Sequence, residues 1–177
     1  MNTLFVEQLL GIDELQVTEF ELDSESKTLR VHLEWREASC LCRSCGGDAF
    51  LRKSEARKSP VRHLDCMEYK TLLYLDSVEM ECSECGAMFN RRPKFLGDCH
   101  YFTDSFVERL MTMSRNAAPK NVAEWHDESS RTFQDVYYRE LEKADNRRQV
   151  APVKHLGIDE ISKEKGHRRY LLLLYDL

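Results

Sequence analysis

The chain has 177 residues, seven of them cysteine, and a formal net charge of −5 at pH 7. Its longest apolar run, residues 171–175, is far shorter than the roughly 20 residues that cross a bilayer, which excludes a helical membrane span. The length allows one domain of ordinary size or two small ones. Seven cysteines without an apolar leader favour a reducing, cytoplasmic compartment where thiols bind metal instead of pairing.

Residues 1–97 are typical of a small module rich in β-strands. An amphipathic helix over 4–15 precedes two alternating segments, 17–22 and 29–35, which a polar turn joins into a hairpin. A further strand region covers residues 69–80. Because the core of such a module is thin, we expect a bound metal to supply much of its stability.

Two matching Cys-x-x-Cys-Gly motifs, at residues 42–46 and 82–86, are the strongest signal in the chain. Two thiolates three residues apart on a tight turn can face one ion, and the glycine lets the turn close. Two such turns supply the four ligands of a tetrahedral zinc site. The predicted zinc ligands are Cys42, Cys45, Cys82 and Cys85.

Other interpretations of the cysteines stay open. The two motifs could be unrelated thiol pairs or disulfides, and Cys40 could replace a ligand through a shifted pairing. Four further residues have spacings that could serve a second metal, although spare core or surface residues are the simpler interpretation. These four are His63, Cys66, Cys99 and His100.

A local cluster of positive charge lies between the two motifs. It contrasts with residues 1–39, which carry three basic and nine acidic side chains. Such a patch suits contacts with phosphates, and a solvated loop explains it nearly as well. The candidate phosphate contacts are Arg52, Lys53, Arg57, Lys58 and Arg62.

Residues 98–150 change to a helical pattern. Thr103 or Asp104 can cap a first helix, Pro119 suits the first turn of a second, and a third runs to about Lys143. We expect Trp125 to join their core. The tight connection before the third helix is typical of a helix-turn-helix, with a plain three-helix packing unit as the equal alternative. The third-helix residues that could contact DNA are Ser130, Arg131, Thr132, Gln134, Tyr138 and Arg139.

Residues 151–177 predict two strands, 154–161 and 168–177, around a short turn. The apolar run 171–175 suits a strand that is buried on both faces inside a larger sheet. No later residue supplies that sheet, so we expect the chain to end inside a domain.

In this order, the pieces resemble the insertion-sequence transposases of the ISL-three type. The resemblance rests on the four cysteines, on residues 121–124 (Asn-Val-Ala-Glu) and on residues 156–161 (Leu-Gly-Ile-Asp-Glu-Ile). It implies an α+β chain with a zinc-ribbon-like DNA-binding module over 1–97 and a helix-turn-helix over 98–150. Residues 151–177 would then be the first hairpin of an incomplete ribonuclease-H-like domain.

The resemblance also implies a function and a catalytic residue. The chain would be the front part of a transposase that recognises terminal inverted repeats in double-stranded DNA, as a homodimer near the nucleoid. Asp159 matches the first acid of the family's catalytic triad. Because that chemistry needs two Mg²⁺ ions held by several carboxylates, we expect a chain that ends at residue 177 not to cut or join DNA.

Two other functions fit the same residues. A regulator derived from a transposase would occupy the repeats without any catalysis. A zinc-ribbon module would instead bind another protein, with the acidic residues 1–39 as its contact surface.

Overall fold

The structure, a computed structural model, describes residues 3–55, 60–146, 156–162 and 170–176. Its contacts divide the chain into two compact units, residues 1–138 and residues 139–177. Within the described residues the chain forms four helices and ten strands, which confirms the prediction of an α+β fold. The expected boundary at residue 97 falls inside the first unit, and the boundary at residue 150 falls inside the second.

Sheet A holds the larger core of the first unit. Its strands, in spatial order, are β1 (Leu15–Asp23), β2 (Thr28–Trp35), β6 (Lys70–Leu75) and β5 (Val61–Arg62). The predicted hairpin is confirmed, because β1 and β2 pair antiparallel with Leu22 opposite Leu29. Alternate residues are buried in β2, at Leu29, Val31 and Leu33, as expected for a strand with one apolar face. In β1 the alternation holds only for Leu15 and Val17, before an irregularity in the pairing after Val17.

Helix α1 (Thr3–Leu10) adds Val6 and Leu10 to the core of sheet A. It is shorter than the predicted helix over 4–15. The reason is Gly11, whose φ of +63° ends the helix and turns the chain into β1.

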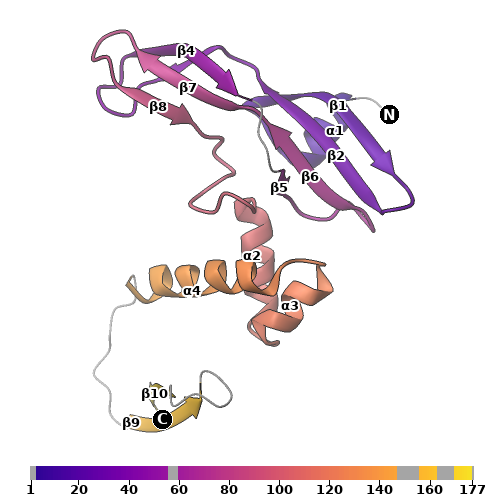
Figure 1. Cartoon of the computed structure of the whole chain (residues 1–177), viewed down its shortest axis with the longest axis vertical. Coiled ribbons are helices and arrows are strands. Elements are labelled where there is room, and N and C mark those ends of the chain that lie inside the picture. The colour runs from indigo at the N-terminus through magenta and orange to yellow at the C-terminus, as the bar shows by residue number, and fades with distance from the viewer. Residues whose placement is uncertain (1–2, 56–59, 147–155, 163–169, 177) are drawn as a thin grey trace. The chain divides into compact units, whose positions relative to one another are not determined.

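Sheet B carries both cysteine motifs. Its strands, in spatial order, are β3 (Ser39–Leu41), β4 (Asp48–Glu55), β7 (Ser77–Cys82) and β8 (Met88–Arg91). All neighbouring pairs in this sheet are antiparallel. The first motif connects β3 to β4 and the second connects β7 to β8, so the two turns lie at the same end of the sheet (Figure 1).

The chain passes between sheets A and B several times. The predicted strand over 69–80 is in fact two strands, β6 in sheet A and β7 in sheet B, with Asp76 between them. Trp35, at the end of β2, packs against the cores of both sheets. The two sheets are therefore joined by short connections and one shared aromatic side chain.

Three helices complete the first unit, as predicted. They are α2 (Asp104–Met113), α3 (Pro119–Trp125) and α4 (Ser130–Asn146), the last of which continues into the second unit. Thr103 caps α2 by accepting a hydrogen bond from the amide of Phe106, and Pro119 lies in the first turn of α3. Phe106, Leu110 and Phe133 are fully buried at the centre of their core.

The prediction that Trp125 is a core residue is wrong. Val122 and Ala123 form the buried side of the short helix α3. Trp125, the last residue of α3, lies off that side and is 62 % exposed.

The described part of the second unit includes an antiparallel hairpin of β9 (Leu156–Ser162) and β10 (Tyr170–Asp176). This confirms the two predicted strands. The larger sheet that would bury the run 171–175 is not found among the described residues, and Leu172, Leu173 and Leu174 are all exposed, as expected for the hairpin without that sheet.

Candidate metal centre and nucleic-acid interface

The four predicted ligands, Cys42, Cys45, Cys82 and Cys85, lie together with all their Sγ atoms within 4.8 Å of one another. The Sγ atoms of Cys42 and Cys85 are 3.7 Å apart, and those of Cys45 and Cys82 are 3.5 Å apart. A tetrahedral ion with Zn–S bonds of about 2.3 Å separates its sulfur ligands by about 3.8 Å. The cluster therefore has the size and the donor set for one tetrahedral metal ion.

The two motifs form turns of the same geometry. In the first turn, the amide of Gly46 donates to the carbonyl of Cys42 at 2.9 Å. In the second, the amide of Gly86 donates to the carbonyl of Cys82 at 3.0 Å. Both glycines have positive φ, +78° and +68°, a conformation that a side chain makes costly. In each turn the first cysteine is buried and the second is exposed.

Backbone amides around the cluster favour the ionised form of one thiol. The amides of Cys45 and Ser44 donate to the sulfur of Cys42 and lower its pKa to about 6. The amide of Gly47 acts to lower the pKa of Cys45, but the sulfurs of Cys82 and Cys85 outweigh it and raise that pKa to about 12. Four sulfurs this close together cannot all carry a negative charge without a cation between them, and a bound metal ion would supply that charge because metals bind thiolates.

The other candidate ligands do not come together into a second metal site among the described residues. Cys40 is half-buried on β3, Cys99 is in the helical core, and His63 hydrogen-bonds through Nδ1 to Oγ1 of Thr103 at 3.0 Å. Within the described part of the chain, the four-cysteine cluster is the one group of three or more side chains arranged to hold a metal.

The basic stretch does not form one exposed patch. Arg52 and Lys53 are exposed on β4, where Arg52 lies 3.7 Å from a carboxylate oxygen of Glu79 and 3.6 Å from one of Glu81. Arg57 and Lys58 lie outside the described residues. The exposed surface around β4 therefore carries basic side chains from β4 and acidic side chains from β7.

Arg62 contradicts its predicted role as a phosphate contact. Only 3 % of the residue is exposed, and its guanidinium binds the carboxylates of Asp65 and Glu128. The guanidinium carbon also lies 4.6 Å from the centre of the Phe106 ring. A buried charge with its partners already in place is not available to DNA.

Helix α4 presents the predicted polar side chains on its outer side. Phe133 and Val136 are its buried residues, and they belong to the core with α2 and α3. Three of the predicted contacts are exposed and three are half-buried. The exposed ones are Arg131, Tyr138 and Arg139, and the half-buried ones are Ser130, Thr132 and Gln134.

Asp159 lies on β9, opposite Leu173 of β10, and its side chain is exposed. It belongs to no group of three metal-ligating side chains among the described residues.

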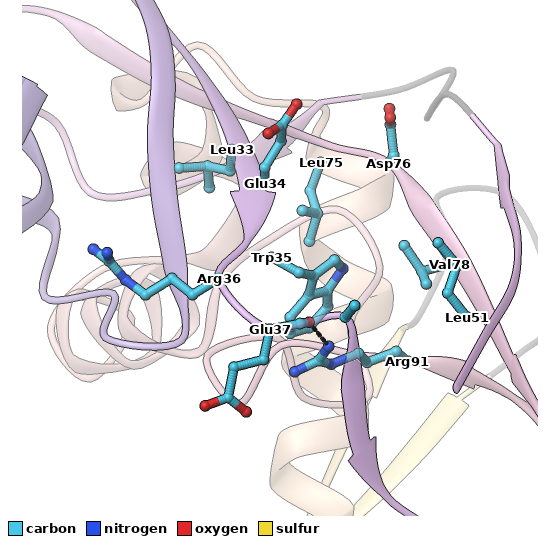
Figure 2. A pocket seen from close by; sticks show the side chains of 11 residues that line it. Leu33, Glu34, Trp35, Arg36, Glu37, Leu51, Leu75, Asp76, Val78 and Arg91 are labelled. Carbon is cyan, nitrogen blue, oxygen red and sulfur yellow. Dashed lines mark hydrogen bonds between the residues drawn. The ribbon is translucent and has the colours of Figure 1, made fainter. Parts of the chain in front are cut away.

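A cavity of about 330 Å³ lies where the two sheets of the first unit meet. Figure 2 shows Trp35 in this pocket with Arg91 beside it and Leu75 nearby. The guanidinium carbon of Arg91 is 4.0 Å from the centre of the Trp35 ring, and Arg91 donates to the carbonyl of Glu37 at 2.6 Å. These contacts join the two sheets and give the pocket a structural role.

The partners of Arg62 could not be predicted from the sequence. Glu128 lies 66 positions away along the chain, so no local pattern connects the two residues. A basic residue beside the apolar Val61 was the one available signal, and the neighbouring basic residues concealed it.

Comparison with protein-family models, curated proteins and solved structures gives no match to this chain. Among the described residues, no helix is long and apolar enough to cross a membrane.

Proposed function

We propose that this chain is the DNA-binding part of an insertion-sequence transposase of the ISL-three type, which recognises the terminal inverted repeats of its element. In this proposal a zinc ion held by the four cysteines stabilises sheet B, and helix α4 contacts the bases. Asp159 would be the first acid of a catalytic site that needs further carboxylates.

The observation that carries the proposal is the arrangement of α4. Its apolar residues, Phe133 and Val136, are buried against the other two helices, while a row of polar side chains faces outward. Arg131 and Gln134 have side chains suited to base edges, and Tyr138 suits a phosphate. A helix held in this way by two others can enter a major groove.

The experiment that tests the proposal is selection from a random pool of duplex DNA by the zinc-loaded chain. Recovery of one recurrent sequence supports base reading, whereas recovery of nothing beyond salt-sensitive background contradicts it. For the recovered sequence, Arg131→Ala and Gln134→Ala should each weaken binding by about 1–3 kcal/mol in a titration.

Arg109→Ala is the matched control, because Arg109 is an exposed arginine on α2 and is not among the candidate contacts. An equal loss in Arg131→Ala and Arg109→Ala, with no loss in Gln134→Ala, would mean that only charge matters, and it would remove α4 from the proposal.

A protein-binding zinc module is the second candidate, and the outer face of sheet B favours it. Leu41, Phe50 and Met88 are 69 %, 53 % and 57 % exposed, and in the pairing of the strands Phe50 and Met88 both lie opposite Glu81. Apolar side chains among carboxylates are better suited to a protein surface than to phosphates. Under this function, weak DNA affinity would be unaffected by Arg131→Ala.

A further inference from the structure

Arg62, a buried arginine, is the centre of a polar network that joins sheet A to the helices of the first unit. Arg62 is the second residue of β5, and its side chain is 4 % exposed. One guanidinium nitrogen donates to the carbonyl of His63 at 2.6 Å and to that of Thr71 at 3.3 Å. These bonds fix the orientation of the guanidinium against the edge of sheet A.

The same guanidinium also reaches the turn that precedes α4. Its Nε donates to a carboxylate oxygen of Glu128 at 2.9 Å, and Glu128 lies two residues before the start of α4. The Phe106 ring of α2 lies against the guanidinium plane at 4.6 Å. One side chain therefore contacts sheet A, α2 and the turn before α4.

Two further polar contacts join the same two regions. Lys70 on β6 lies 3.0 Å from the Glu128 oxygen that Arg62 binds, and it donates to the carbonyl of Asp127 at 2.8 Å. Asp65 holds Arg62 and also lies 3.3 Å from Nδ1 of His126. The turn before α4 is thus tied to residues 62–70 at three successive positions, 126, 127 and 128.

The backbone adds a fourth connection. The amide of Arg62 donates to the carbonyl of Tyr101 at 2.7 Å, and the amide of Thr103 donates to the carbonyl of Arg62 at 2.9 Å. These bonds form a parallel bridge between Arg62 and Phe102, just before the start of α2. The turn before α4 is attached to residues 62–70 through the contacts described above.

Arginine is suited to this task because its planar fork of five N–H donors fixes angles as well as distances. A buried guanidinium is costly unless its donors are satisfied, and here two carboxylates and two carbonyls satisfy them. A surface ion pair such as that of Arg52 has no comparable constraint.

We propose that Arg62 is a positioning residue, which holds α4 in one orientation relative to the four-cysteine cluster by binding Glu128. One consequence of this role rests on the proposed function. With the orientation of α4 fixed, the protein would recognise one DNA site of fixed internal spacing.

The test is the measurement of amide residual dipolar couplings by NMR on the zinc-loaded chain. In the wild-type protein, couplings from sheets A and B and from α2–α4 should fit one alignment tensor. In Glu128→Gln, which removes the charge but keeps the shape, two different tensors should be needed. Arg62→Lys should give the same result because a single ammonium cannot reach all the partners.

Arg52→Lys is the matched control, since it makes the same change at an exposed arginine on β4 that pairs with two carboxylates on β7. It should keep one tensor. Zinc content and the chemical shifts within each sheet should stay unchanged in all variants, which separates lost orientation from lost folding. If Glu128→Gln and Arg62→Lys both fit one tensor, the positioning role is wrong.

The DNA consequence has its own readout. Glu128→Gln should bind the selected duplex about tenfold more weakly than the wild-type protein. Arg30→Lys, at an arginine that pairs with Glu21 and Asp23 and is not among the candidate DNA contacts, should keep the wild-type affinity. If the wild-type chain selects no DNA sequence, the proposed function fails, but the dipolar couplings still decide the positioning role.

Discussion

Sheets A and B each have four strands, but they are stabilised by different means. The core of sheet A contains twelve buried aliphatic residues, contributed by its strands, by α1, by Ile12 and by Leu96. The core of sheet B contains five buried residues, and two of them are the cysteines Cys42 and Cys82. Apolar burial can hold sheet A together, and we propose that a metal ion on the four cysteines supplies the stability that the smaller core of sheet B lacks.

Loss of one cysteine ligand should have the largest effect and should break sheet B alone. In Cys85→Ser the proposed zinc ion loses one of four ligands, and structural zinc sites supply on the order of 10 kcal/mol of binding free energy. We expect the purified variant to retain no zinc by elemental analysis and the amide signals of β7 and β8 to lose their dispersion.

Cys66→Ser is the matched control, because Cys66 is half-buried and lies outside the four-cysteine cluster. Retention of one zinc ion by the Cys85→Ser variant, with sheet B intact, would refute the four-cysteine assignment.

A cavity in the other core should have a smaller effect and the opposite distribution. Leu73 on β6 is 1 % exposed in the core of sheet A. Leu73→Ala should lower the free energy of unfolding by about 2–5 kcal/mol, as measured by denaturant titration, and leave the zinc content unchanged.

Leu22→Ala, at a residue 48 % exposed on β1, should cost far less. A Leu73→Ala variant that loses zinc would show that the two cores are not independent.

The cysteine cluster and the β1–β2 hairpin could be predicted because their determinants are local. A Cys-x-x-Cys-Gly turn sets its own geometry, and alternating residues set one buried face. The division of residues 69–80 at Asp76 could not be predicted, since the parallel pairing of β6 with β2 involves strands far apart in the sequence. Nothing local distinguishes a strand that continues in one sheet from one that crosses to another.

The candidate DNA contacts divide in the same way. The polar side of α4 follows from helical spacing around Phe133 and Val136. The burial of Arg62 does not follow from spacing, because the carboxylate that compensates its charge comes from Glu128 in another segment. Charge counts along a sequence cannot distinguish a buried, paired arginine from an exposed one.

Acid should reveal a third and smaller contribution, which comes from the junction of sheet A with α2. Burial lowers the pKa of His63 to about 4, and the charge of Arg62 acts in the same direction. In the unfolded chain His63 binds a proton at its ordinary pKa of 6.5, whereas in the folded protein it stays neutral down to about pH 4. The contribution of neutral His63 to the free energy of unfolding is therefore complete above pH 6.5 and is lost as the pH falls toward 4. The loss should reach about 3 kcal/mol.

Denaturant titrations at pH 7 and at pH 4.5 give the free energy of unfolding of the wild-type protein and of His63→Gln. The wild-type protein should lose more of it between the two pH values than His63→Gln. His32→Gln, at an exposed histidine on β2, should behave like the wild-type protein. Equal acid sensitivity in the wild-type protein and His63→Gln would assign the loss to other groups.

The most direct test of the contrast between the two sheets is amide hydrogen exchange of the zinc-loaded chain before and after treatment with a chelator. We expect the amides of β4, β7 and β8 to lose protection while those of β1, β2 and β6 keep it. Unchanged protection in sheet B, or an equal loss in both sheets, would contradict the claim that the four cysteines hold sheet B together through a metal.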